Sequence, residues 1–403
     1  MATYAYAVRD ASGALHKGQA EAETIEILRN RLKEQGFEVQ DLKAIKGKRK
    51  SAGFGRIKLN DLALFCRQFS TMMDAGVSLI RSMDVLSRQN ENPKLRRVLV
   101  EVGERIEGGE TLSRALARYP KAFSNLFVGL VRAGEVSGTL EESLQRLSQF
   151  LESDVALRRK VKAAMTYPVI VVVVALSIVM GLVMFVVPSF FKLFSDLGMR
   201  EEQFPATTKF LVDLSHFLTS KWWVVIIAII IFVMAYKAFA NTTFGRRTVD
   251  RLKLKMPVFG KLHHRICLAR FSRTLGTLMA AGVPILQAME TVAGMLGNAV
   301  LADAILEARA RIREGDRIGV PLEKSKMFPP MVVHMIGVGE ESGSLDFMLQ
   351  KIADYYEAEV EAMLASLTAA IEPLLIVVLG FMVGFIVISM FAPMLSVITE
   401  LSK

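Results

Sequence analysis

The sequence has few cysteines and lacks the short motifs of the common enzyme classes. Cys66 and Cys267 are the only cysteines in 403 residues. Each lies in an apolar helical pattern, which predicts buried thiols of a reducing compartment. No GxxxxGKS/T phosphate loop, GxSxG turn or HExxH helix occurs. His263 and His264 are adjacent, so they point away from each other on a helix, and no third metal ligand is near. We therefore expect no catalytic residue, no metal and no cofactor.

Two further features are missing, and the composition defines the class. The first residues, MATYAYAVRDASG, lack the basic and then apolar order of a signal peptide. The basic residues have no aromatic platform beside them, so we expect no nucleic-acid partner despite the net charge of +10. The chain is 52% hydrophobic and 22% charged, which is typical of water-soluble domains joined to a few membrane spans.

The chain contains two copies of one unit. Residues 67–83, RQFSTMMDAGVSLIRSM, match residues 273–289, RTLGTLMAAGVPILQAM. Residues 123–140 match residues 328–345 at an offset that differs by one residue. Each copy enters a long apolar stretch through a proline, at Tyr167-Pro168 and at Glu372-Pro373. Such a duplication is more typical of a scaffold than of an enzyme.

Three apolar stretches are long enough to cross about 30 Å of hydrocarbon, which needs roughly 20 helical residues. They are 167–188, 222–240 and 371–393. Basic residues before the first stretch and after the second predict a cytoplasmic location for 1–166 and 241–370. The neutral hairpin 189–221 and the short tail 394–403 are then periplasmic. The second stretch has no counterpart in the repeat and returns the chain to the cytoplasm.

The fold class predicted is a mainly α, polytopic membrane protein with a small α/β N-terminal domain. Residues 1–45 show the alternating apolar and polar pattern of strands on either side of one helix. Residues 46–58 are expected to form a basic linker that contacts anionic lipid head groups. Residues 59–166 and 241–370 have the apolar periodicity of two homologous helical bundles. Thr139 and Glu142 predict a capping box for a helix that continues, with a bend near Pro168, into the membrane.

One polar motif, G-E-x-S-G-S/T-L, occurs in both copies. The second glycine of each motif is expected to adopt a backbone conformation that other residues resist. The glutamates have two interpretations, a local partner at a neighbouring helix start or a contact with another protein. Glu372 is interpreted as an interfacial residue before a proline, with a proton relay as the alternative. The candidate residues are Gly134, Glu135, Ser137, Gly138, Gly339, Glu340, Ser342 and Gly343 in the motif, and Tyr167, Pro168, Glu372 and Pro373 where the copies enter the membrane.

The MDAGVSL and MAAGVPI segments, the AGEVSG and VGEESG turns, and the TYP and IEP segments together resemble the PilC/GspF family over the whole chain. This resemblance implies a non-enzymatic platform in a bacterial inner membrane, with a cytoplasmic N-terminus and a periplasmic C-terminus. The implied partners are a hexameric cytoplasmic ATPase motor, pilin or pseudopilin subunits, other inner-membrane assembly proteins, membrane lipid and further copies of the chain. The TYP segment and the basic linker favour type IV pilus assembly. The alternatives are a type II secretion platform, an oligomeric transporter or channel, and a membrane-bound enzyme or sensor.

Overall fold

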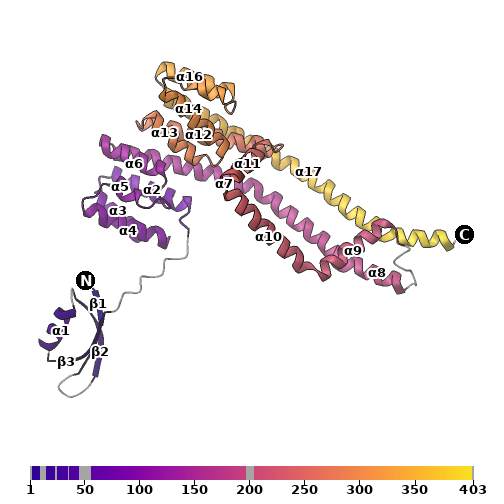
Figure 1. Ribbon diagram of the computed structural model, residues 1–403, viewed down its shortest axis with the longest axis horizontal. Helices are drawn as coiled ribbons and strands as arrows, with labels where there is room; N and C mark the ends of the chain where they lie inside the picture. Colours follow the sequence, from indigo (N-terminus) through magenta and orange to yellow (C-terminus); the bar gives the residue numbers. More distant parts are fainter. Residues whose placement is uncertain are drawn as a thin grey trace. The chain divides into compact units, whose positions relative to one another are not determined.

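The computed structural model describes residues 2–9, 15–22, 25–34, 36–44, 56–196 and 204–401 (Figure 1). Most of the basic linker 46–58 and part of the hairpin 189–221 lie outside these residues. The chain divides into two compact units, Met1–Thr111 and Leu112–Lys403. The boundary between the units falls inside the first copy of the repeat, so each unit is described by itself.

The N-terminal domain is a small sheet with one helix, as the alternating sequence predicted. The sheet has the strand order β2-β1-β3, and both pairings are antiparallel. A register shift between Ala7 and Val8 interrupts the pairing of β1 with β3. Val8 and Leu28 are each 1% exposed and form its described core. The elements are β1 (Ala2–Arg9), β2 (Leu15–Ala22), α1 (Ile25–Glu34) and β3 (Glu38–Ala44).

The helices of the two copies follow each other in the same order, with apolar faces at helical spacing. In the first copy, Asn92 caps a helix by accepting hydrogen bonds from the amides of Lys94 and Leu95. Asn298 does the same in the second copy, for Val300 and Leu301. The first-copy helices are α2 (Leu59–Asp74), α3 (Leu79–Gln89), α4 (Pro93–Glu107), α5 (Leu112–Ala117), α6 (Asn125–Ser137) and α7 (Leu140–Gly181).

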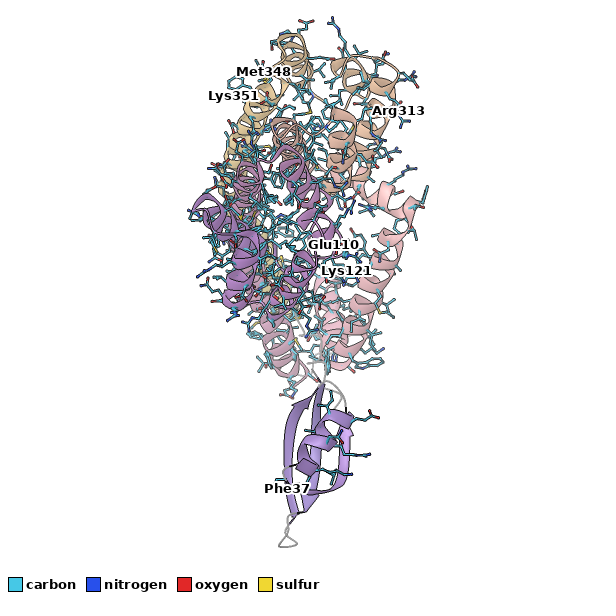
Figure 2. The ribbon with its side chains drawn as sticks, turned by 90° about the vertical axis from the view of Figure 1, so that its left-hand side faces the viewer. Phe37, Glu110, Lys121, Arg313, Met348 and Lys351 are labelled. Atoms are coloured by element: carbon cyan, nitrogen blue, oxygen red, sulfur yellow. The ribbon has the colours of Figure 1, made fainter. Side chains whose placement is uncertain are left out.

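The second copy repeats this order after one helix that has no counterpart among the described residues of the first copy. That extra helix is α11 (Thr243–Lys255). Met348 and Lys351, labelled in Figure 2, lie on the first turns of the last helix, where the Lys351 ammonium stands 5.3 Å from the centre of the Phe347 ring. The second-copy helices are α12 (Phe259–Ala280), α13 (Ile285–Met295), α14 (Ala299–Arg313), α15 (Gly319–Lys324), α16 (Pro330–Ser342) and α17 (Leu345–Leu401).

Three helical segments of the described chain are long and apolar enough to cross a membrane, which agrees with the predicted number. The first is α7 with a short π-helix η1 (Leu182–Val186) and α8 (Val187–Asp196), the second is α10 (Trp222–Asn241), and the third is α17. Helix α7 passes Pro168 without interruption, as predicted. Helix α17 passes both Pro373 and Pro393 and includes the predicted tail as far as Leu401.

A helix between the first two spans packs against the far ends of the first and third spans. Helix α9 (Ala206–Ser220) places Leu211 and Val212 in a buried cluster with Val183, Val187 and residues of α17. The Thr208 hydroxyl donates a buried hydrogen bond of 2.5 Å to the carbonyl oxygen of Ser389. The far ends of the first and third spans are therefore packed together through α9. Helix α10, in contrast, has no buried residue along its length.

Candidate functional site

The repeated motif forms the same sharp turn in both copies, where α6 meets α7 and α16 meets α17. Gly138 ends α6 with φ 74°, and Gly343 ends α16 with φ 69°. Side chains other than glycine resist this left-handed conformation. The expected role of the two glycines is thus found in both copies.

The serine of the motif holds the last turn of each helix. The Ser137 hydroxyl lies 2.9 Å from the Ala133 carbonyl oxygen and 2.6 Å from the Thr139 hydroxyl. Ser342 repeats this arrangement, 2.7 Å from the Val338 carbonyl oxygen and 2.6 Å from the Ser344 hydroxyl. The predicted capping box is wrong, because the Thr139 side chain accepts no hydrogen bond from the start of α7 and is engaged with Ser137 instead.

Each glutamate of the motif binds the start of a short neighbouring helix. The Glu135 carboxylate accepts a hydrogen bond from the Ser113 amide, with both oxygens 3.2 Å away. The Glu340 carboxylate accepts one from the Ile318 amide at 2.9 and 3.1 Å. A negative charge at a helix N-terminus is favoured both by the free amide groups and by the helix dipole. The geometry favours the local interpretation of these glutamates over a contact with another protein.

The first glycine of the motif has a role that the sequence did not reveal. A Cβ atom at Gly134 would lie 2.7 Å from the Ser143 Cβ, and one at Gly339 would lie 2.9 Å from the Leu345 Cα. Real Cβ atoms do not approach other atoms this closely, so only glycine lets α6 and α16 cross the following helix at this distance. The spacing of the motif is compatible with such a crossing, but nothing in it specifies the distance between helices.

The four membrane-entering positions lie inside continuous helices and touch no common site. Tyr167 is 47% exposed and Pro168 is buried, both within α7. Glu372 and Pro373 are exposed on α17. Because a proline has no amide hydrogen, the carbonyl groups of Ala164 and Ala369 lose their usual helical partners. The interfacial role of Glu372 stays a prediction.

The two copies meet where α7 of the first packs against α12 and α17 of the second. Leu157 of α7 shares a buried cluster with Leu262 of α12 and with Val360 and Leu364 of α17. This cluster lies on the predicted cytoplasmic side, before the apolar parts of α7 and α17 begin. We call this contact the inter-copy joint.

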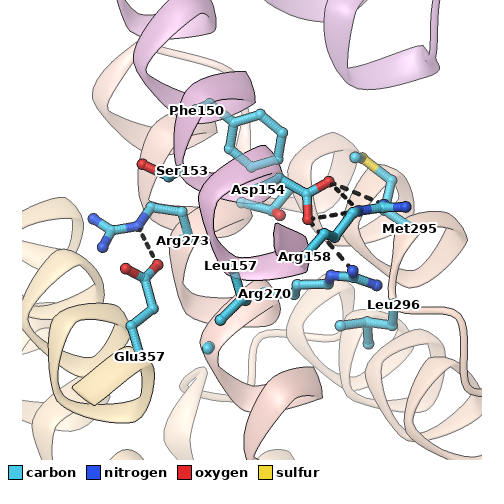
Figure 3. A pocket seen from close by; sticks show the side chains of 12 residues that line it. Phe150, Ser153, Asp154, Leu157, Arg158, Arg270, Arg273, Met295, Leu296 and Glu357 are labelled. Atoms are coloured by element: carbon cyan, nitrogen blue, oxygen red, sulfur yellow. Dashed lines mark hydrogen bonds and ion pairs between the residues drawn. The ribbon is translucent and has the colours of Figure 1, made fainter. Parts of the chain in front are cut away.

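Charged groups surround the inter-copy joint (Figure 3). Asp154 of α7 lies 3.0 Å from Arg158 on its own helix and 3.4 Å from Arg270 of α12. Lys160 of α7 pairs with Glu361 of α17. The Arg146 guanidinium donates a hydrogen bond of 2.5 Å to the Ala280 carbonyl oxygen at the end of α12. Charged side chains of α7 thus bind both α12 and α17 of the second copy.

Arg273 joins α12 to α17 beside the same joint. It lies 3.0 Å from Glu357 and 2.7 Å from Asp354. Burial alone would lower the pKa of Arg273, but the two carboxylates raise it above its usual value. A cavity of about 30 Å³ lies between these groups and is lined by Phe150, Leu157 and Met295 among others. It has room for about one or two water molecules.

One cluster of side chains has the composition of a cysteine nucleophile site but not its chemistry. Cys267 lies 3.9 Å from the His263 ring, which lies 3.4 Å from the Asn298 amide. Burial raises the pKa of the Cys267 thiol to about 11, and burial is also the main cause that lowers the pKa of His263. A buried, protonated thiol is not a nucleophile, and Asn298 is already the cap of α14. No group of metal ligands occurs among the described residues.

These features define a class before any relative is considered: a duplicated helical bundle whose copies each continue into a membrane span. The family model described as "Type II secretion system (T2SS), protein F" matches the chain twice, at residues 65–188 and 271–393. The model described as "Type II secretion system protein F, N-terminal domain" matches residues 1–43. The chain belongs to this family, and the resemblance noted in the sequence is confirmed.

Several curated relatives cover nearly the whole chain. The "Type IV pilus assembly protein PilC" of Thermus thermophilus is 42% identical over 100% of both chains. The protein of the same name from Myxococcus xanthus is 41% identical over 98% of this chain and 95% of its own. The "Type II secretion system protein F" of Vibrio cholerae is 34% identical over 100% of both chains.

Proposed function

We propose that this chain is the inner-membrane platform of a type IV pilus assembly system. In this role it couples a cytoplasmic hexameric ATPase motor to the insertion or removal of pilin subunits. The relatives named for pilus assembly are 42% and 41% identical to it, and the secretion relative is 34% identical. The identities favour the pilus system over the secretion system.

One structural observation carries the mechanical part of the proposal. Helices α7 and α17 each run without interruption from a predicted cytoplasmic bundle into a membrane span. They are packed together at the inter-copy joint and again, through α9, at their far ends. A force applied to either bundle therefore displaces both spans together, because no flexible segment intervenes. This arrangement suits a protein that transmits movement across a membrane surface.

The proposal includes a topology and a set of partners. Residues 1–166 and 241–370 face the cytoplasm, where the motor binds, and the chain ends in the periplasm. Pilin subunits and other inner-membrane assembly proteins meet the spans, and several copies of the chain assemble in the membrane. Helix α10, which has no buried residue, is available for such contacts. In this scheme the repeated motif has a structural role, because its glutamates are occupied inside each copy.

The platform itself performs no catalysis in this proposal. The purified chain is expected to hydrolyse no nucleotide, since the sequence has no phosphate loop. Hydrolysis that persists in the purified chain after contaminating ATPases are removed would contradict this part.

The test of coupling breaks the continuity of α7. A Gly-Gly-Ser insertion after Lys162 places a flexible joint between the bundle and the span. The same insertion after Gly315, in the turn between α14 and α15, serves as the control, because it leaves both α7 and α17 continuous. We expect the first insertion to abolish surface pili and the second to leave them, with both proteins present in the membrane. Normal piliation with the first insertion would refute the coupling.

Deletion of the gene separates the pilus function from the secretion function. Loss of surface pili with unchanged protein secretion supports the proposal. Retained pili with lost secretion would instead assign the chain to a type II secretion system, as its similarity to the Vibrio cholerae protein allows.

A further inference from the structure

Helix α11, which lies between the two copies, begins directly at the end of the second span. Helix α10 has 20 residues, which at about 1.5 Å each is close to the 30 Å of the hydrocarbon core. Trp222 and Trp223 mark its first end, so its last residue, Asn241, reaches the opposite boundary. Only Thr242 separates α10 from α11, and Figure 1 shows α11 at the end of α10. Helix α11 therefore starts at the depth of the lipid head groups.

The turn between the two helices is tight and fixes how α11 leaves the span. The Thr242 hydroxyl lies 2.7 Å from the Phe239 carbonyl oxygen and accepts a hydrogen bond of 3.0 Å from the Gly245 amide. A Cβ atom at Gly245 would overlap the Phe239 carbonyl group, so the position admits only glycine. This turn leaves no room for an alternative direction of α11.

The inner face of α11 is bound to the second bundle. Asp250 is 3% exposed, and its carboxylate accepts a hydrogen bond of 2.9 Å from the Ala299 amide at the start of α14. The same carboxylate lies 2.8 Å from the Lys253 ammonium. The Asn298 amide donates to the Asp250 carbonyl oxygen at 3.3 Å. Helix α11 is thus a rigid part of the second copy.

The outer face of α11 combines apolar and cationic side chains. Phe244, Arg251, Leu252 and Lys255 recur at the spacing of one helical face, and all are exposed. Phe244 is 74% exposed and Leu252 is 62% exposed, although both are large and apolar. Arg251 and Lys255 have no carboxylate partner among the residues that the structure describes. We call these four residues the outer stripe.

We propose that the outer stripe lies on the cytoplasmic leaflet and binds the head groups of anionic phospholipids. Phe244 is three residues from the end of the span, so its Cα lies within about 10 Å of the hydrocarbon boundary. At this depth an apolar ring enters the acyl boundary, while arginine and lysine reach the phosphate groups. An acidic protein partner would suit the two cations equally well, but it would leave Phe244 and Leu252 unexplained. The inference depends on the proposed topology only for the name of the leaflet.

A consequence follows for the second bundle. Because α11 is held both by the turn after α10 and by the cap of α14, head groups bound to the outer stripe fix the tilt of the bundle relative to the membrane. The first copy has no such helix in its described residues, so the contact distinguishes the two copies.

The first experiment places a reporter in the outer stripe. The sequence contains 2 tryptophans, so Trp222→Phe and Trp223→Phe combined with Phe244→Trp leave one indole. The full-length protein is reconstituted in phosphatidylcholine vesicles with or without phosphatidylglycerol. We expect blue-shifted emission that is quenched by lipids brominated near the head group. Emission typical of water, insensitive to those lipids, would overturn the inference.

The second experiment measures lipid preference. Phosphatidylglycerol is titrated into the full-length protein in detergent, and thermal stabilisation gives the apparent affinity. Arg251→Gln with Lys255→Gln is expected to weaken this affinity about 30-fold, since each cation at the surface contributes about 1 kcal/mol. The control, Arg313→Gln with Lys324→Gln, removes two exposed cations elsewhere in the second copy, and Arg313 is visible in Figure 2. It should change the affinity less than about twofold, within ordinary surface effects.

The other possible results of these two experiments also test the proposed lipid binding. Equal losses in the two double variants would show a non-specific charge effect and overturn the inference. Stabilisation by inorganic phosphate to the same extent as by phosphatidylglycerol would indicate a free-phosphate site and also overturn it. Should the stripe variant fail to fold, the tryptophan reporter still decides. None of these results depends on pilus assembly, so a failure here is distinct from a failure of the proposed function.

Discussion

Because α16 crosses α17 closely, replacing glycine by alanine is expected to change the stability in opposite directions at two positions of α16. Gly339→Ala should destabilise the protein, whereas Gly337→Ala, two residues earlier in α16, should stabilise it. An added Cβ at Gly337 meets nothing within 4 Å. At Gly339 it would lie 2.9 Å from the Leu345 Cα and 3.1 Å from the Met348 Cβ. The Leu345 atom belongs to the backbone and cannot rotate away.

The magnitudes follow from two terms. Alanine is favoured over glycine in a helix interior by about 0.5–1 kcal/mol, which is the whole effect expected at Gly337. At Gly339 the overlap forces the helices apart, and such overpacking costs about 1–3 kcal/mol. The two variants should therefore differ by about 1–3 kcal/mol in the free energy of unfolding, with Gly339→Ala the less stable. The first copy provides a second pair, because Gly134 is crowded by Ser143 and Gly129 is open.

The assay uses the buried thiols of the full-length protein in detergent. Cys66 is 0% exposed and Cys267 is 1% exposed, so a thiol-reactive dye reports unfolding. Cys66→Ser leaves Cys267 as the reporter of the second copy. A change of 1 kcal/mol shifts the unfolding temperature by about 2–4 °C in a domain of this size. Equal shifts of the same sign at Gly337 and Gly339 would refute the close-approach argument, as would stabilisation by Gly339→Ala.

Three further predictions concern the motif glutamates, Asp250 and the membrane topology. Glu135→Ala and Glu340→Ala should each lower stability by about 1 kcal/mol through the lost helix cap; in a piliation assay, loss of pili with unchanged melting would instead reveal a partner contact. Asp250→Asn should lower stability at pH 7 by roughly 1–3 kcal/mol. Burial would raise the pKa of Asp250, but the hydrogen bonds from Lys253 and the Ala299 amide hold it below its usual value. This contribution is complete above the unfolded pKa and is lost as the pH falls through the folded one, so the difference in melting between wild type and variant should shrink as the pH falls below the ordinary value of 3.8. In a background without native cysteines, Ser195→Cys should react with an impermeant thiol reagent applied to intact cells and Lys324→Cys should not; the reverse pattern would invert the topology.

The sequence predicted the elements that depend on local chemistry. Apolar periodicity located the helices of both copies, hydropathy located the three spans, and the second glycine of each motif predicted a left-handed turn at Gly138 and Gly343. Each of these signals lies within a few residues of the structure it specifies. The capping box predicted at Thr139 is also a local signal but is wrong, because the Thr139 hydroxyl pairs with the Ser137 hydroxyl and accepts no hydrogen bond from the start of α7.

The contacts that were not predicted join residues far apart in the chain. Glu135 and Glu340 each bind an amide 22 residues away, and the motif that contains them carries no trace of that partner. The Asp154–Arg270 ion pair crosses from one copy to the other. Positions 134 and 339 require glycine because of the distance between two crossing helices, and that distance is defined only once the helices are packed. A comparison of the two copies did single out the motif positions, but it could not identify the residues that they contact.

Helix α10 packs least against the rest of the chain among the three spans, so its direction can be set only at its two ends. Spans α7 and α17 are packed together at both ends, whereas α10 has no buried residue. Packing along its length therefore cannot orient α10 within the chain. Its direction is set at its two ends, by the turn after α9 and by the turn at Thr242 that leads into α11. Since Asp250 ties α11 to α14, a displacement of the second bundle moves the cytoplasmic end of α10 together with α17, which belongs to the same bundle. A bundle movement driven from the cytoplasm thus reaches all three spans, α7 and α17 through the inter-copy joint and α10 through α11. Such transmission is what a platform that handles membrane-embedded subunits requires.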